Sequence, residues 1–249
     1  MSGHSKWAGI KHKKAVTDAR RGKLFTRLLK EISVAARLGG GDPAGNPRLR
    51  TAIQDAKTSN VPNDNIDRAI KKGTGELEGA EYEEITYEGY GPGGVAVLVE
   101  AMTDNRNRTV SEVRHLFAKH GGNLGENGCV SWMFDQRGYF AIPKDAMDEE
   151  QFIKLALEIG ADDLSTEGED YEIYTTLEDY VSAREELEGR EIPLDAHELA
   201  MVPQSYLEVG ADKAPQMLRL LEALEDYDDV QHVWANLDID EDVLAGSSS

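Results

Sequence analysis

The sequence predicts a multidomain α+β protein. An N-terminal three-helix bundle comes first, followed by an α/β sandwich domain that is interrupted by an inserted ferredoxin-like α+β domain. Two observations predict this fold. The spacing of apolar residues changes from helical steps to alternation near residue 80, which indicates a change from helices to strands. Residues 138–203 then show the order strand, helix, strand, strand, helix, strand, which is typical of a ferredoxin-like unit.

The first domain, residues 1–75, is expected to contain three short helices. Residues 18–37 carry a single apolar stripe, Asn46-Pro47 is typical of a helix start, and Val61-Pro62 precedes a third stripe. Three helices with one apolar face each can bury those faces only against one another. The stripe of the first helix consists of Leu24, Phe25, Leu28, Leu29, Ile32 and Ala36.

A discontinuous domain is expected from residues 80–137 and 204–240. The alternating residues 82–88 and the apolar run 95–99 predict a hairpin with a central second strand. Thr109 and Glu112 form a capping-box pair, which predicts a helix start.

A strand is expected at 129–134, and a new unit starts at residue 138. One helix and one strand after residue 204 are too few to stand alone. We therefore expect them to complete the sheet that begins at residue 82, with 138–203 inserted.

Charge is divided sharply along the chain, whose net charge is −20. The first thirty residues hold nine Lys or Arg and a single acid, Asp18. Residues 76–249 hold 11 Lys or Arg and 41 Asp or Glu. A basic arm that leads into a helix, joined to an acidic body, predicts a nucleic-acid-binding end.

The residues expected to contact nucleic acid are mainly cations of this arm and of the first helix, and most would contact phosphates. Trp7 could stack on bases with His12, or it could anchor the arm to the bundle. The expected contact residues are Lys6, Lys11, His12, Lys13, Lys14, Arg20, Arg21, Lys23, Arg27, Arg48 and Arg50.

Residues 104–108, Asp-Asn-Arg-Asn-Arg, lie between a predicted central strand and a predicted helix start. Arg106 and Arg108 could hold an anion beside the free N–H groups of the helix. Alternatively, the Asp and Asn residues shape the turn and the arginines pair with nearby Glu side chains. The sequence leaves both interpretations open.

Several function classes are not expected. Gly89, Gly91 and Gly94 match a dinucleotide-binding spacing, but strand residues follow them, so we interpret them as a hairpin turn. No pattern predicts a catalytic residue set, a metal site or a cofactor. No apolar run is long enough for a membrane span, so none is expected. The basic N-terminal residues do not have the pattern of a secretory leader, so none is expected there either. Because Cys129 is the single cysteine, no disulfide framework can form and we expect a cytoplasmic protein. Because no catalytic residue set is recognisable, we also expect a non-enzymatic one.

Long segments of the chain also resemble a known family. They include GHSKWAGIKHKKAVTDARRGKLFTRLLKEI at the N-terminus, GGGDPAGNPRLR, and the stretch from YEGYGPGGVAVLVEAMTDNRNRTV to GGNLGENG. Together with HELAMVPQSY, these resemble the YebC family of probable transcriptional regulators. The resemblance runs over roughly residues 2–240 and implies the same three-domain plan.

The sequence thus favours a DNA-binding regulator of transcription that acts through the basic arm and first helix. The resemblance also implies an alternative, because the family includes the mitochondrial translational activator of cytochrome c oxidase subunit I and members tied to the ribosome. That alternative is a translation factor that binds ribosomal or transfer RNA. A third interpretation is an acidic scaffold. Under all three, the acidic domains would suit a basic protein partner.

Overall fold

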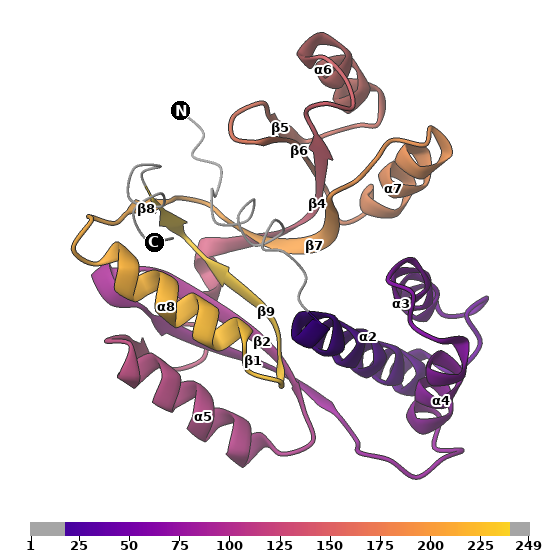
Figure 1. Cartoon of the computed structure of the whole chain (residues 1–249), viewed down its shortest axis with the longest axis horizontal. Helices are drawn as coiled ribbons and strands as arrows, with labels where there is room; N and C mark the ends of the chain where they lie inside the picture. Colours follow the sequence, from indigo (N-terminus) through magenta and orange to yellow (C-terminus); the bar gives the residue numbers. More distant parts are fainter. Residues whose placement is uncertain (1–17, 240–249) are drawn as a thin grey trace.

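The computed structural model describes residues 18–239, and the side chains from residue 22 onward. Within these residues the protein is a mixed α+β structure with two four-stranded antiparallel sheets and one short parallel strand pair (Figure 1). None of the described helices is long and apolar enough to cross a membrane.

Three helices at the N-terminal end share one core. They are α2 (Asp18–Gly39), α3 (Pro47–Thr58) and α4 (Asn63–Gly73). Asn46 caps α3 by accepting a hydrogen bond from the N–H of Leu49, as the sequence predicts. The three apolar faces meet around a core that includes Ile32, Leu49, Ala52, Ala56 and Ile66.

The first sheet has the strand order β3-β1-β2-β9. The expected hairpin is confirmed as β1 (Glu83–Tyr90) and β2 (Ala96–Thr103). The other two strands are β3 (Asn123–Leu124) and β9 (Val230–Ala235). Two helices, α5 (Arg106–Lys119) and α8 (Ala214–Glu225), pack on one face of this sheet around a large apolar core (Figure 1).

The second sheet has the order β5-β6-β4-β7, and all neighbouring strands are antiparallel. Its helices, α6 (Glu149–Glu158) and α7 (Tyr180–Gly189), share a core with it. Its strands are β4 (Phe134–Pro143), β5 (Asp163–Ser165), β6 (Asp170–Thr175) and β7 (Ala196–Pro203).

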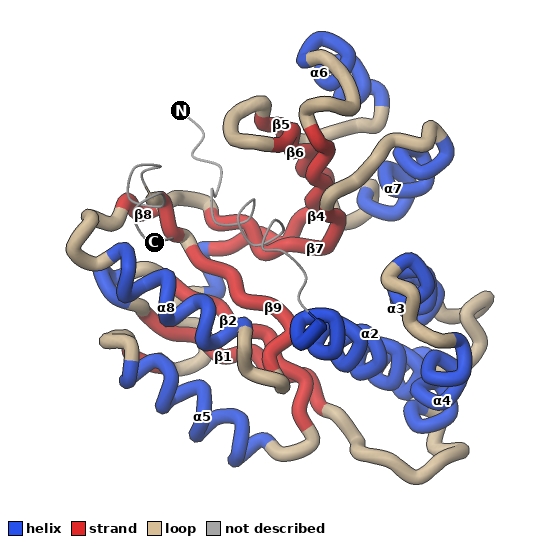
Figure 2. The backbone as a smooth tube through the Cα atoms, viewed as in Figure 1, coloured by secondary structure: helices blue, strands red, loops and turns tan. Residues whose placement is uncertain are grey.

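The two sheets pack against each other, and their helices lie on the outer faces (Figure 2). Leu98 and Trp234 of the first sheet share a buried cluster with Tyr139, Tyr174 and Ala200 of the second. The remaining elements are the short strand pair β8 (Leu207–Glu208) and β10 (Leu237–Asp238), and two 3₁₀ turns, η1 (Pro92–Gly94) and η2 (Ser131–Met133).

Two local predictions are wrong. No strand forms at 129–134, because the backbone turns at η2 and β4 begins only at Phe134. Thr109 is not a helix cap either: α5 begins earlier, with Asn105 as its N-cap. The side chain of Thr109 is buried, and its hydroxyl lies within donating distance of the Thr103 hydroxyl and the Asp229 carboxylate.

The domain boundaries at residues 75, 138 and 203 stay a prediction. β9 does join the sheet of β1 and β2, and residues 134–203 supply every strand of the second sheet.

Candidate nucleic-acid interface

Helix α2 has two different buried faces. Its apolar stripe packs on α3 and α4, except for Leu24, which was expected in the stripe but is exposed. At 3.6 residues per turn, Lys23, Arg27 and Lys30 lie together on the opposite side. This basic face contacts the acidic body at the end of α8 and in the loop before β9 (Figure 1).

Lys23 and Arg27 bind the C-terminal end of α8. The ammonium of Lys23 donates to the carbonyl oxygen of Asp226 at 2.6 Å and to its carboxylate at 3.2 Å. Arg27 donates to the carbonyl oxygen of Glu225, and burial lowers the pKa of its guanidinium. Cations at this position complement the partial negative charge of a helix C-terminus.

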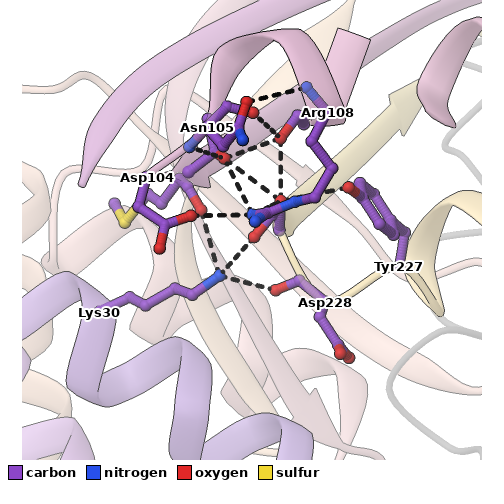
Figure 3. A network of polar contacts seen from close by, with 10 residues as sticks. Lys30, Asp104, Asn105, Arg108, Tyr227 and Asp228 are labelled. Carbon is purple, nitrogen blue, oxygen red and sulfur yellow. Dashed lines mark hydrogen bonds and ion pairs between the residues drawn. The ribbon is translucent and has the colours of Figure 1, made fainter. Parts of the chain in front are cut away.

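Lys30 enters a buried polar network that joins α2 to the first sheet (Figure 3). Its ammonium donates to the carboxylate of Asp229 at 3.0 Å and to the carbonyl oxygens of Met102 and Asp228 at 3.1 and 2.9 Å. The side chains of Lys30 and Asp229 are each only 7% exposed. An ammonium buried this deeply is tolerated because all three of its donors have acceptors.

The other oxygen of Asp229 is bound by Arg108 at 2.7 Å and by the hydroxyl of Thr109 at 2.8 Å. Burial alone would raise the pKa of Asp229. Hydrogen bonds from Arg108, Lys30 and Thr109 outweigh burial and hold that pKa at about 2. The aspartate therefore stays charged throughout the neutral range.

Arg108 is thus held by carboxylates, since it also donates to Asp104 at 2.9 Å. Its hydrogen bond to Asp229 is the largest cause of its raised pKa. The alternative in which the arginines pair with acids describes Arg108, although its partners are Asp rather than Glu. Arg106 is exposed at the start of α5. An anion site at Arg106 and Arg108 stays a prediction, and the ion pairs of Arg108 count against it.

Arg48 also binds acids. Its guanidinium donates to Glu31 at 2.6 Å and to Glu84 at 2.6 Å, and these hydrogen bonds raise its pKa. Arg50 is exposed and donates to the carbonyl oxygen of Pro43. It contributes to a shallow depression along one face of α3 that also includes Ile53, Gln54, Lys57 and Thr58.

The remaining expected contact residues lie outside the described part of the chain. These are Lys6, Lys11, His12, Lys13 and Lys14, together with the side chains of Arg20 and Arg21. Of the expected contact residues, Lys23, Arg27 and Arg48 thus donate hydrogen bonds to oxygen atoms of the protein itself. The nucleic-acid role of the arm stays a prediction.

Sequence reasoning missed Lys30 as a positioning residue. The spacing of Lys23, Arg27 and Lys30 on one helical face was the available signal. Other cations of the N-terminal helices are exposed and form no ion pair with described residues; they are Arg37, Lys57, Arg68, Lys71 and Lys72. In residues 18–239, no group of His, Cys, Asp and Glu side chains is arranged to hold a metal ion.

Comparisons with known proteins identify the family. The model for the TACO1/YebC protein N-terminal domain matches residues 5–76, and that for the TACO1/YebC second and third domain matches residues 82–237. A probable transcriptional regulatory protein from Desulfosudis oleivorans is 56% identical, with 98% of this chain and 99% of that protein aligned. One from Geobacter sulfurreducens is 59% identical, with 96% of each chain aligned.

A solved structure is similar as well. The crystal structure of a conserved hypothetical protein from Aquifex aeolicus matches with a TM-score of 0.87 at 53% identity, over 95% of this chain and 98% of that chain. The resemblance of the sequence to the YebC proteins is therefore confirmed, and the chain belongs to the TACO1/YebC family.

Proposed function

We propose that the protein is a cytoplasmic, non-enzymatic regulator of transcription that binds duplex DNA through its basic N-terminal arm. The observation that carries this proposal is the charge division, nine cations and one acid in the first thirty residues of a chain with net charge −20. Relatives named probable transcriptional regulatory proteins support the regulatory role. Such an arm attracts phosphates without reading base sequence.

The described structure supports a division of labour along the basic stretch. Lys23, Arg27 and Lys30 fix α2 to the acidic body. The cations that precede them in the sequence would then make the phosphate contacts, with Arg50 and Lys57 of α3 as exposed additions. The acidic body repels phosphates, so it would orient the protein on its target rather than enlarge the contact area.

An RNA target in translation is the second candidate, and one observation favours it. A helix that reads a DNA major groove needs a free face for base contacts. Along the described residues α2 buries its apolar face in the helical core and its basic face against the body. A partner recognised by shape and 2′-hydroxyl groups, such as structured ribosomal RNA, needs no recognition helix.

We also propose that residues 138–203 form an inserted ferredoxin-like domain. The strand order β5-β6-β4-β7 with antiparallel neighbours supports this assignment, as does a core built only from that segment.

Salt titration tests the role of the arm. If it neutralises about five phosphates, the slope of log affinity against log salt on duplex DNA will be roughly −4 to −5. Changing Lys13 and Lys14 together to Glu will flatten this slope by at least about 2. The pair Lys144→Glu and Lys154→Glu, on the inserted unit, is a control with the same charge change, and it should leave the slope unchanged. A wild-type slope near zero would refute phosphate binding.

Competition at one fixed salt concentration then separates the two targets. Near 0.15 M salt, a DNA regulator will prefer a duplex promoter fragment to structured ribosomal RNA with the same number of phosphates. If the protein prefers the RNA by tenfold or more, the proposed role in transcription is wrong and a role in translation is favoured.

A further inference from the structure

The loop between β3 and β4 is built around a buried carboxylate. Glu88, on β1, accepts hydrogen bonds from the N–H groups of Gly128, Val130 and Ser131 at 2.7, 2.7 and 2.8 Å. Burial would raise the pKa of Glu88, but these three bonds lower it. A charged acceptor with three backbone donors fixes the path of the loop in one conformation.

This loop holds two aromatic rings at the surface. The hydroxyl of Tyr90 and the indole N–H of Trp132 both donate to the carbonyl oxygen of Cys129, at 3.0 and 3.2 Å. Trp132 is nevertheless 67% exposed and Tyr90 is 38% exposed. Both rings are thus positioned by their polar atoms while their apolar surfaces face solvent. Rigid aromatic side chains of this kind are the usual anchors of protein interfaces.

The segment of the sequence around Trp132 is acidic. Glu126 and Asp135 are exposed on either side of it in the sequence. Burial raises the pKa of the Cys129 thiol, and the nearby carboxylates of Glu88 and Glu126 raise it further. Residues 121–136 contain no Lys or Arg, and the next residue, Arg137, is paired with Asp162 at 2.9 Å. This surface would repel a phosphate backbone and attract a cation.

We propose that Trp132 and Tyr90 form a docking platform for a basic segment of a partner protein. An Arg or Lys side chain of that partner lies over the Trp132 ring in a cation–π contact, and Glu126 and Asp135 supply the opposite charge. The platform is built from other segments of the sequence than the basic arm, and the proposal does not depend on which nucleic acid the arm binds.

Fluorine NMR of the full-length protein tests this proposal. Incorporated 5-fluorotryptophan reports on Trp7, Trp132 and Trp234 separately, and the Phe variants assign the resonances. The probe is an eight-residue peptide of alternating Arg and Gly. We expect it to shift the Trp132 resonance, whereas the same peptide with Gln in place of Arg will not. Because Trp132→Ala lacks the reporting ring, the Kd of the Arg peptide is compared by isothermal titration calorimetry, and it should rise about threefold in that variant, as expected for loss of an exposed cation–π contact.

Variants with unchanged packing complete the test. Trp132→Phe should restore most of the affinity. The pair Glu126→Gln and Asp135→Asn should weaken binding and reduce its salt dependence, while Glu149→Gln with Glu150→Gln on α6 should do neither.

An Arg peptide that binds Trp132→Ala as tightly as wild type would overturn the proposal. So would an eight-nucleotide single-stranded oligonucleotide that shifts the Trp132 resonance more than the peptide does, because it would indicate base stacking. A Trp132 resonance that shifts in Lys13→Glu with Lys14→Glu, in the absence of peptide, would assign the platform to the arm of this chain instead.

Discussion

Removing the charge of Asp229 should be among the most destabilising single changes in the protein. Asp229→Asn keeps the size of the side chain but leaves the buried ammonium of Lys30 facing a neutral amide. Breaking a buried ion pair from one side costs about 3–5 kcal/mol, mostly because the remaining charge stays desolvated. The burial of both side chains in the structure, each 7% exposed, places the pair in that class.

A variant that changes both residues separates this desolvation cost from the net contribution of the Lys30–Asp229 ion pair to the free energy of unfolding. Lys30→Met with Asp229→Asn removes both buried charges and keeps their volume. Arg108 loses a partner but is half exposed, with its side chain 50% accessible, so water can replace the lost bond. We expect the double variant to be more stable than Asp229→Asn alone by about 2 kcal/mol, because a paired buried charge can be replaced by apolar groups at little cost.

Urea denaturation followed by circular dichroism measures both effects. The free energy of unfolding of the two single variants and the double variant forms a cycle with wild type. If Asp229→Asn lies within about 1 kcal/mol of wild type, or if the single effects simply add in the double variant, the coupling of α2 to the sheet through this pair is refuted.

Further predictions concern stability. Ile32→Ala should cost about 2–5 kcal/mol and half-buried Leu28→Ala less, so equal urea midpoints would contradict the packing of α2. Glu88→Gln should cost about 1.5–3 kcal/mol, as expected for a charged acceptor, and should speed hydrogen exchange in the loop after β3.

In the folded protein the pKa of Asp229 is lowered from 3.8 to about 2. The stabilisation from this carboxylate is therefore present above about pH 4 and lost as the pH falls toward 2. The gap between wild type and Asp229→Asn should therefore narrow on acidification, and a constant gap would refute this. Replacing residues 134–203, so that β4 is removed whole, with a short Gly/Ser linker should leave a cooperative unfolding transition, and loss of near-ultraviolet circular dichroism in the remnant would refute the inserted domain.

Local structure was predictable where one segment contains all the determinants. Asn46 followed by Pro47 marked the start of α3, and the alternation before Gly89 marked β1. The capping-box prediction at Thr109 failed because an equally good cap, Asn105, lies one turn earlier and the hydroxyl of Thr109 is needed for Asp229.

The candidate site could not be predicted to the same depth. The sequence identified Lys23 and Arg27 as cations, but their partners lie about 200 positions away, at the end of α8. No local pattern shows whether a cation will meet a phosphate or a carbonyl of its own chain. The positions of the charged residues in the sequence show the charge division, whereas the direction in which each cation points required the fold.

The contacts of α2 have a consequence for experiments on fragments. A fragment that contains only residues 1–76 would lack α8 and Asp229, so Lys23, Arg27 and Lys30 would lose these partners and be left to solvent. Such a fragment would carry three cations that the intact protein neutralises, and its affinity for any polyanion would be inflated. In the intact protein, by contrast, the acidic body competes with nucleic acid for these three cations. Affinities for polyanions measured on the isolated N-terminal unit would therefore be higher than those of the whole protein.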